Sequence, residues 1–479
     1  MIHSVGGQHL TIRVELENQP GTFAHLATAI ATHGAGLGAV DIISTHNDTI
    51  VRDIGVHVRD EEHIEELLRA IKEIPGVHLV NVSDQILQLH SGGKLQITPR
   101  FHIKNRQTLA QAYAPGVFNV CRTIMRDPKA TTAFTMKRNA VAIITDGSAV
   151  IGLGDIGHDA AIPVMEGKAM IYRDFAGIDA FPLPLATRNV DAIVDTIANI
   201  SPIFGIINLE DIDSSRSHEI QRKLMQRLEM PIFHDVHDGS SIVVVAGLLN
   251  ALRVVGKDIA DASIVIYGIT YRSRALAEML IAAGAKRVVG CDASGAISRR
   301  HGDSNSEVMR WFAENTNPAT FEGSLADALA GSDVLLGMLA HGPLTPDMVK
   351  AMSKDSVVFH IGDPQPNVSP DKLMGIARIV ATNRSDTPNQ LVSILASPGV
   401  LRGILDVNAF TINMAMKLAA ARALADTIQP DELSEDHILP GIFNPEVVKN
   451  VAKGVAAAAL KTEVGRRRKL KIAISREHS

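Results

Sequence analysis

The chain has few cysteines and no long apolar run. Its 479 residues include two cysteines, Cys121 and Cys291, which cannot build a disulfide framework and which fit a reducing compartment. No run of 18 apolar residues and no leading signal pattern is present, so we expect a cytoplasmic protein with no membrane partner. The net charge of -5 implies no general affinity for polyanions, and the small basic run at 465–471 does not indicate a nucleic-acid site.

The composition is that of a well-buried globular protein, with 46% hydrophobic and 21% charged residues. A chain of this length allows roughly three domains. We predict an N-terminal domain over residues 1–90, a substrate and metal domain over 91–250, a dinucleotide-binding domain over 251–400, and helices with a basic tail over 401–479.

The N-terminal segment shows the order βαββαβ. Strands are predicted at 9–16, 39–46, 50–58 and 77–89, and helices at 22–32 and 61–74, which is the ferredoxin-like split motif. With the Pro20-Gly21 entry to the first helix, the segment resembles an ACT domain. That resemblance implies a site for a small effector, often an amino acid. A dimerisation module without a ligand is the alternative.

From residue 107 to about 400, strands alternate with helices. This alternation predicts an α/β fold with parallel, helix-covered sheets. Two segments, the alanine-rich 412–428 and the later 447–461, are predicted to be amphipathic or buried helices.

Carboxylates follow two apolar runs that we interpret as buried strands. Glu210 and Asp211 come after the run 203–209, and Asp235 comes after the run 230–233. Acidic residues at the carboxyl ends of neighbouring strands make an oxygen-rich pocket for a hard cation such as Mg²⁺ or Mn²⁺. A solvated strand end is the alternative for either cluster alone.

Two glycine-rich turns compete for a dinucleotide. Gly152, Gly154 and Gly157 match G-x-G-x-x-G after predicted strands at 140–145 and 149–151, with Asp174 and Asp179 about 20 residues further on. However, Pro163 stands where the crossover helix is expected, and proline is poorly tolerated inside a helix.

The second turn follows a predicted strand at 262–267 and precedes a predicted helix at 275–283 and a strand at 287–291. Asp292 lies 24 residues after Gly268, as a ribose contact requires. Thr270 and Ser273 replace the second and third glycines and would crowd the pyrophosphate. Arg272 or Arg274 could hold a phosphate instead.

From about residue 107 to 461 the chain resembles bacterial malic enzymes, and its front end resembles the ACT-bearing subgroup. The shared stretches are Ala112-Tyr-Ala-Pro-Gly-Val117, Val150-Ile-Gly-Leu-Gly-Asp-Ile-Gly157, Pro163-Val-Met-Glu-Gly-Lys168, Phe175-Ala-Gly-Ile-Asp179, Asn208-Leu-Glu-Asp-Ile212, Arg384-Ser-Asp386, Pro388-Asn-Gln390 and His437-Ile-Leu-Pro440. The resemblance implies that Gly152 to Gly157 belongs to the substrate domain and that the cofactor binds the unit starting near Ala262.

The same resemblance implies oxidation and decarboxylation of malate with NAD, less so NADP, and a divalent metal. Lys168 then resembles the base and Tyr113 the acid; as a base, Lys168 must lose its proton near neutral pH, which burial beside other cations could arrange. Glu210 and Asp211 resemble metal ligands, with Asp235 as the neighbouring acid. The remaining expectations are a homodimer or higher homo-oligomer and cofactor contacts from Gly268, Arg272, Asp292, Asp363 and Ser393.

Four motifs depart from the family pattern. Val236 replaces a metal-binding carboxylate, Asp363 an asparagine, and Val392-Ser393 an asparagine pair, while the turn after Gly268 has lost two glycines. Three interpretations therefore stand: a malic enzyme with unusual motifs, a relative acting on another acid with or without hydride transfer, and a non-catalytic ligand-binding homologue.

Overall fold

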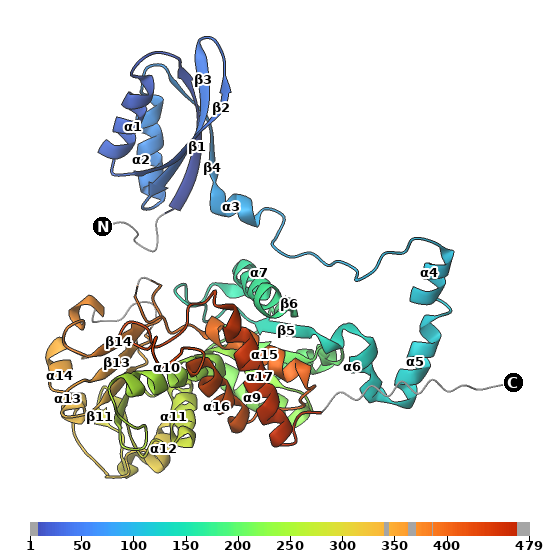
Figure 1. The fold of residues 1–479 in the computed structure, drawn as a ribbon, viewed down its shortest axis with the longest axis vertical. Helices are drawn as coiled ribbons and strands as arrows, with labels where there is room; N and C mark the ends of the chain where they lie inside the picture. The colour runs from blue at the N-terminus through green and yellow to red at the C-terminus, as the bar shows by residue number, and fades with distance from the viewer. Residues whose placement is uncertain (1–7, 340–343, 363–369, 386, 467–479) are drawn as a thin grey trace. The chain divides into compact units, whose positions relative to one another are not determined.

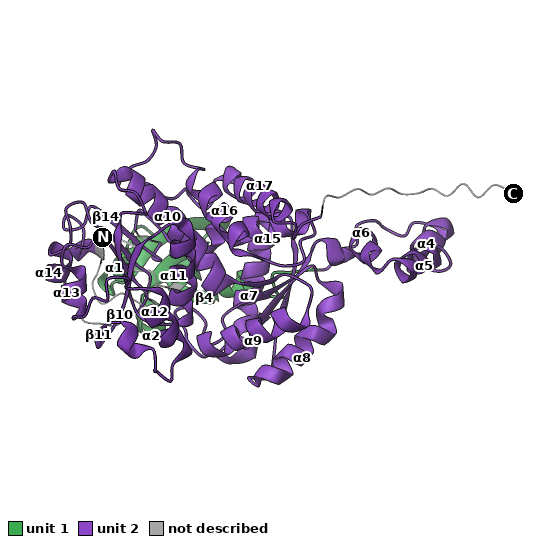
Figure 2. Ribbon diagram, turned by 90° about the horizontal axis from the view of Figure 1, so that it is seen from below, with its two compact units in different colours: residues 1–96 green, residues 97–479 purple. Residues whose placement is uncertain are grey.

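A computed structural model describes residues 8–339, 344–362, 370–385 and 387–466. The chain divides into two compact units, Met1–Gln96 and Ile97–Ser479 (Figure 2). None of the described helices has the length and apolarity needed to cross a bilayer.

The first unit is a four-stranded antiparallel sheet with two helices on one face (Figure 1). Its elements are β1 (Gln8–Glu17), α1 (Thr22–Thr32), β2 (Gly36–Thr45), β3 (Thr49–Val58), α2 (Glu61–Lys72) and β4 (Val77–Asp84). The strand order is β2-β3-β1-β4. Alternate residues of β1, among them Ile12 and Val14, share one core with Leu26 of α1 and Leu67 of α2. The predicted ACT fold is confirmed.

The last strand of this unit is shorter than predicted. It ends at Asp84, whose carboxylate accepts hydrogen bonds from the amides of Ile86 at 2.7 Å and Leu87 at 3.1 Å. This side-chain cap starts the short helix α3 (Gln85–His90) inside the predicted strand.

The second unit begins with three short helices and then forms a parallel sheet. The helices are α4 (Arg106–Ala112), α5 (Val117–Arg126) and α6 (Thr131–Phe134). The sheet alternates with its helices as β5 (Ala140–Thr145), α7 (Gly157–Ala176), β6 (Asp179–Pro184), α8 (Val190–Ile200), β7 (Ile206–Leu209), α9 (Ser214–Arg227) and β8 (Ile232–His234). The strand order is β6-β5-β7-β8, all parallel. Strands β5, β7 and β8 are buried throughout, as continuous apolar runs predict.

A second sheet follows in the same unit. Its elements are β9 (Ser263–Tyr267), α11 (Tyr271–Ala283), β10 (Arg287–Asp292), β11 (Gly295–Ala296), α12 (Glu307–Asn315), α13 (Leu325–Leu329), β12 (Val334–Gly337), α14 (Pro346–Lys350), β13 (Val357–His360) and β14 (Ile379–Thr382). The order β11-β10-β9-β12-β13-β14 is parallel except for β11. The strand order reverses between β9 and β12, which makes a Rossmann-like switch point there.

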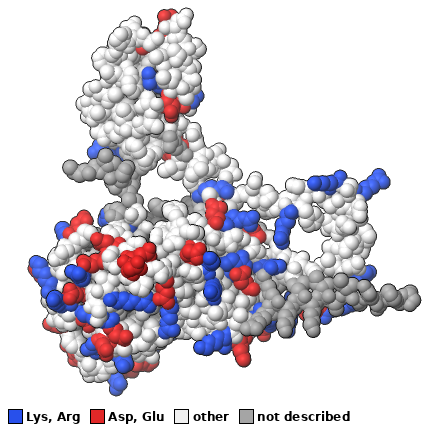
Figure 3. Space-filling view, in the orientation of Figure 1, with Lys and Arg blue, Asp and Glu red and all other residues white. Residues whose placement is uncertain are grey.

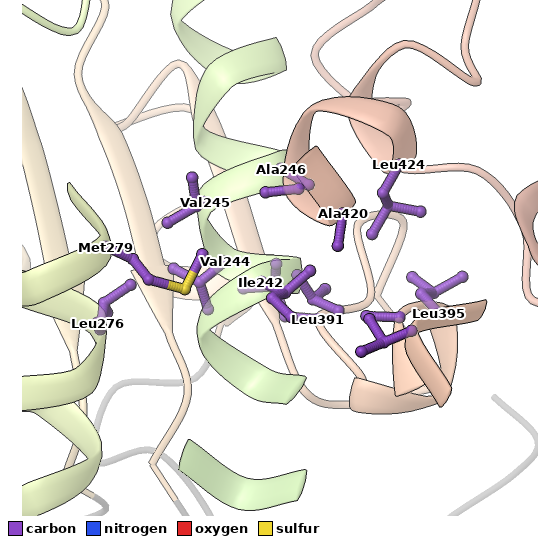
Figure 4. Close-up of a cluster of buried hydrophobic side chains, with 14 of the residues drawn as sticks. Ile242, Val244, Val245, Ala246, Leu276, Met279, Leu391, Leu395, Ala420 and Leu424 are labelled. Carbon is purple, nitrogen blue, oxygen red and sulfur yellow. The ribbon is translucent and has the colours of Figure 1, made fainter. Parts of the chain in front are cut away.

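Helix α10 (Ser240–Val254) joins the two sheets and is buried over most of its length. It packs between α11, through Leu276 and Met279, and α16 (Met414–Ala425), through Ala420 and Leu424 (Figure 4). The other C-terminal helices are α15 (Ser397–Asp406) and α17 (Pro445–Lys461). Residues of both sheets belong to one continuous core, so the domain boundaries near residues 250 and 400 stay predictions.

Three local expectations were wrong. Pro163 lies inside α7; because Asp159, four residues earlier, is exposed, water can reach the carbonyl that the proline leaves without a donor. The strand predicted at 149–151 is only an isolated bridge of Val150 to Gly154. Helix α11 starts at Tyr271 because Thr270 caps it.

Candidate functional site

The carboxyl edge of the sheet β6-β5-β7-β8 brings a lysine and two carboxylates together. Glu210 follows β7, Asp235 follows β8, and Lys168 lies on α7. The Lys168 Nζ atom is 2.7 Å from Asp235 Oδ2 and 3.3 Å from Glu210 Oε1, and only 11% of the lysine side chain is exposed. We call these three residues the charged triad. Its position at the strand ends is the one expected of a ligand site in a parallel sheet.

The charged triad holds Lys168 in its protonated form. Burial by itself lowers the pKa of Lys168, but the neighbouring charges of Asp235 and Glu210 outweigh burial and raise this pKa well above its ordinary value. The expectation that other cations would lower this pKa was therefore wrong. The cause is the surrounding charge, which is negative.

Glu210 is the weaker of the two carboxylic acids in the charged triad. Burial and the charge of Asp235 raise the pKa of Glu210 to about 8, although Lys168 opposes the shift. Asn208 donates to Glu210 Oε2 at 3.0 Å and to the Tyr172 hydroxyl at 3.2 Å. Glu210 is thus the member whose charge changes near neutral pH.

Asp235 also accepts a hydrogen bond from a residue that is distant in the sequence. Ser393 donates to Asp235 Oδ2 at 2.5 Å across 158 residues of sequence. Burial raises the pKa of Asp235, yet Lys168 and Ser393 lower it below its ordinary value. Ser393, which was predicted to contact the cofactor, is therefore joined to the charged triad.

Asp235 opens a π-helical turn, Asp235–Gly239, that also contains Val236. The side chains that follow do not replace the missing carboxylate. His237 Nε2 lies 3.1 Å from Ser214 Oγ, and Asp238 pairs with Lys417 of α16 at 2.5 Å. Burial lowers the pKa of His237 well below its ordinary value, so this ring is neutral.

The described part of the chain does not form a tight metal site of three carboxylates. Among the described residues, no three His, Cys, Asp or Glu side chains are grouped so that they could hold a metal ion. Asp211 is buried beside Glu210 in a left-handed conformation with φ of 50°, but it is not part of such a group. Glu210 and Asp235 are suitable oxygen donors, and Asp235 Oδ1 is buried without a hydrogen-bond partner. This set fits a divalent cation held by two carboxylates whose charge Lys168 already offsets in part.

The two glycine turns differ in where their acids lie. Asp179 is the first residue of β6 and pairs with Ala140 at the start of β5, so it lies at the sheet edge opposite the turn containing Gly152. Asp292 is the last residue of β10, beside the end of β9 that leads into Gly268. A ribose-binding acid must lie at the carboxyl end of the second strand, and Asp292 alone meets this condition.

At the Gly268 turn, side chains of the turn itself accept hydrogen bonds from its backbone amides. Gly268 has φ of 107°, and a Cβ there would lie 2.6 Å from Leu339 Cγ, so only glycine fits. Thr270 accepts a hydrogen bond from the Ser273 amide at 3.2 Å, and Ser273 Oγ accepts one from the Thr270 amide at 2.8 Å. This capping box uses amides that a helix N-terminus otherwise offers to a phosphate.

The arginines of this turn differ in their contacts. Arg274 pairs with Glu278 and Glu307, both at 2.9 Å, and is not directed to the turn. Arg272 Nη1 on α11 donates to the carbonyl of Ile361, the residue that follows β13, at 3.4 Å. Asp363 lies outside the described residues.

Tyr113, the predicted acid, is not near the charged triad in a single chain. It follows α4 and is 71% exposed, and both ribbon views place α4 and α5 apart from α7 (Figures 1 and 2).

Two buried neighbours of the charged triad were not predicted. Tyr172 stands four residues after Lys168 on α7, and Asn208 stands two residues before Glu210 on β7. Helical and strand periods place both pairs on one face, so this spacing could have identified them.

The comparisons with known proteins agree with this architecture. Residues 92–189 match the family described as "Malic enzyme, N-terminal domain" and residues 6–81 match the ACT domain family. The chain is 43% identical to an NAD-dependent malic enzyme of Geobacillus stearothermophilus over 96% of each chain. It is 41% identical to a bifunctional malic/malolactic enzyme of Bacillus subtilis, covering 81% of this chain and 95% of that protein.

Among solved structures, a malic enzyme of Pyrococcus horikoshii is similar with a TM-score of 0.76 and 38% identity, covering 80% of this chain and 92% of that one. An NAD-dependent malic enzyme of Thermotoga maritima gives a TM-score of 0.74 and 35% identity, with 78% and 99% covered.

Proposed function

Because this chain belongs to the malic enzyme family, we propose that it oxidises malate with NAD and releases carbon dioxide to form pyruvate. The hydroxyl at C2 of malate must lose its proton and C2 must lose a hydride, for which NAD, when bound, would be the acceptor. The bond from C3 to the β-carboxylate then breaks, and the resulting enolate takes a proton at C3. These steps need a positive group at the C2 oxygen, a proton acceptor and a proton donor.

The observation that carries this proposal is the burial of Lys168 between Glu210 and Asp235. A fixed ammonium in a site of low polarity stabilises negative charge on the C2 oxygen of the substrate. Asn208 and Ser393 hold the two carboxylates, so the lysine is oriented before substrate arrives. As a base, Lys168 would act only once the charge of its carboxylate partners is offset.

Glu210 and Asp235 are the residues that would hold Mg²⁺ or Mn²⁺. The bound cation would supply a Lewis acid at the substrate's C2 oxygen. Because Val236 offers no third carboxylate, the affinity should be low. NAD is favoured over NADP because Asp292 suits a ribose hydroxyl and repels a 2′-phosphate. For the ACT unit we propose a small effector as ligand.

An absorbance assay tests the function. Purified protein with malate, Mn²⁺ and NAD should produce NADH, and Lys168→Met should lower kcat by about 10²–10⁴-fold. Lys223→Met is the matched control, because Lys223 of α9 pairs with Asp191 of α8 and Glu219 of α9 and has no contact with the charged triad. Absence of NADH and NADPH from the wild type with either cofactor would refute the proposal. Equal losses in both variants would remove Lys168 from the mechanism.

A further inference from the structure

Two aromatic rings join the halves of the second unit. We call the part around the sheet β6-β5-β7-β8 the first half and the part around the sheet β11-β10-β9-β12-β13-β14 the second half. His218 of α9 in the first half stacks on Tyr271 of α11 in the second half, with ring centroids 4.1 Å apart and ring planes inclined by 19°. We call these two residues the ring pair. It adds a side-chain contact to the covalent link between the halves through α10.

Tyr271 is held by other residues of the second half. Its hydroxyl donates to Glu307 Oε2 at 3.4 Å, and Glu307 Oε1 accepts a hydrogen bond from Arg274 Nη1 at 2.9 Å. Tyr271 directly follows Thr270, whose side chain caps α11. The ring of Tyr271 is therefore fixed to the Gly268 turn that precedes this helix.

The helix that carries His218 is fixed to the turn that Asp235 opens. Ser214 Oγ, at the start of α9, lies 3.1 Å from His237 Nε2 in that turn. A second hydrogen bond, of 3.4 Å, joins a later residue of α9 to the same turn. Through α9, the ring pair thus connects the Gly268 turn to a carboxylate of the charged triad.

The ring pair is held by stacking and not by charge. Burial and the positive charge of Arg274 lower the pKa of His218, so its ring is neutral at pH 7. His218 Nε2 is 3.9 Å from Glu307 Oε1, which is too long for a hydrogen bond. Figure 3 shows Lys and Arg interspersed with Asp and Glu on one face of the second unit, and charges mixed in this way produce little long-range force.

The contact between the halves matters because each half supplies one part of the proposed reaction. The charged triad would hold malate, and the Gly268 turn with Asp292 would hold NAD. Hydride transfer is fast only when the reacting carbons are about 3–3.5 Å apart, and an error of about 1 Å can cost roughly 10²-fold in rate. The distance between the two sites therefore affects the rate of reaction separately from the affinity for either ligand.

We propose that His218 and Tyr271 are positioning residues for hydride transfer, because their stacked rings hold the Gly268 turn at the distance from the charged triad that the reaction requires. They act through α9 and α11 and need no contact with malate or NAD. This role rests on the proposed function, whereas the mechanical link between α9 and α11 does not.

Variants that remove or keep a ring test this role in turnover. Tyr271→Leu and His218→Ala each remove one ring and should lower kcat by about 10–10²-fold, while KM for malate and for NAD stays within about threefold. Tyr271→Phe and His218→Phe keep a flat ring and should retain at least about half of the wild-type kcat. Phe variants as slow as the ringless ones, or a change in KM with kcat unchanged, would overturn the proposal.

A double variant tests whether the two rings act as a pair. The kcat of His218→Ala with Tyr271→Leu should be about that of the slower single variant, because loss of the first ring already removes the stack. If the two losses multiply instead, each ring acts by itself, and the pair does not position the turn.

Hydrogen–deuterium exchange tests the link between the helices without turnover. In Tyr271→Leu and in His218→Ala, the amides of α9 and of the first turn of α11 should exchange about threefold to tenfold faster, because local opening no longer breaks the stack. Phe181→Leu is the matched control, since it removes a ring from a pair with Phe204 inside the first half, and it should leave exchange in α11 unchanged. Faster exchange only in the helix that carries the substitution would show that the rings do not link the two helices.

The outcomes separate the two proposals. Faster exchange in both helices, in a protein whose wild type produces neither NADH nor NADPH from malate, would support the link while the proposed function fails. Unchanged exchange, or ringless variants with the kcat of an active wild type, would refute the role of the ring pair while the proposed function stands.

Discussion

Removal of the Glu210 carboxylate should change how stability depends on pH. The folded chain keeps a proton on Glu210 up to a pKa of about 8, because burial and Asp235 disfavour its charge. In the unfolded chain the same group ionises near its ordinary value of 4.5. The higher pKa in the folded chain therefore stabilises the folded state fully at a pH below the pKa of the unfolded chain. This stabilisation is lost as the pH rises through the pKa of Glu210 in the folded chain. Glu210→Gln mimics the protonated acid and should not show this loss.

The pKa values set the size of the effect. The pKa of Glu210 changes from 4.5 in the unfolded chain to about 8 in the folded chain. Because one pKa unit is worth about 1.4 kcal/mol, the largest change in the free energy of unfolding that this shift can cause is on the order of 4–5 kcal/mol. At pH 5 the variant and the wild type should have similar free energies of unfolding. At pH 9 the variant should be more stable, by at least about 1 kcal/mol.

The fluorescence of the single tryptophan measures the unfolding of the second unit. Trp311 lies in α12 and packs against the core of the second unit, so its fluorescence in urea follows that unit without the ACT domain. Glu219→Gln on α9 is the control, because Glu219 is only partly buried and pairs with Lys223; this variant should keep the pH dependence of the wild type. If the free energies of the wild type and Glu210→Gln run parallel from pH 5 to pH 9, the site does not raise the pKa of Glu210, and the electrostatic argument fails.

Three further changes test the rest of the site. Val236→Asp should tighten Mn²⁺ binding by about tenfold or more, because a third carboxylate is added; calorimetry showing equal affinity would mean that the wild type already has a third ligand. Thr270→Gly should strengthen NAD binding severalfold by freeing helix amides for the pyrophosphate, and tight wild-type binding with no change would point to another phosphate contact. Lys417→Met should lower the free energy of urea unfolding by about 3 kcal/mol, because it leaves the buried Asp238 without its ion-pair partner. Adding Asp238→Asn should restore most of the lost free energy of unfolding. A Lys417→Met variant with the free energy of unfolding of the wild type would show that this ion pair does not stabilise the fold.

The sequence determined the elements and their order by itself. Continuous apolar runs are enough to predict β5, β7 and β9, because strands buried on both faces need no polar alternation. The acids Glu210 and Asp235 follow such runs, so their place at the strand ends could be predicted as well. Boundaries were less accurate where a side-chain cap starts a helix, as Asp84 and Thr270 do, since a cap competes with the preceding extended backbone.

Only the tertiary structure decided the charge state and the completeness of the site. The pKa of Lys168 rises because Glu210 and Asp235, 42 and 67 residues away, lie beside its ammonium. Burial and these charges shift the pKa in opposite directions, and no local sequence pattern shows which of the two effects is larger. The two glycine turns likewise follow similar strands, but parallel pairing places Asp292 at the carboxyl end and Asp179 at the amino end. The exposure of Tyr113 follows from the path of the chain around α4, which depends on contacts that a motif does not contain. Local patterns fix local backbone geometry, whereas electrostatics and site assembly depend on distances between residues that are far apart in the chain.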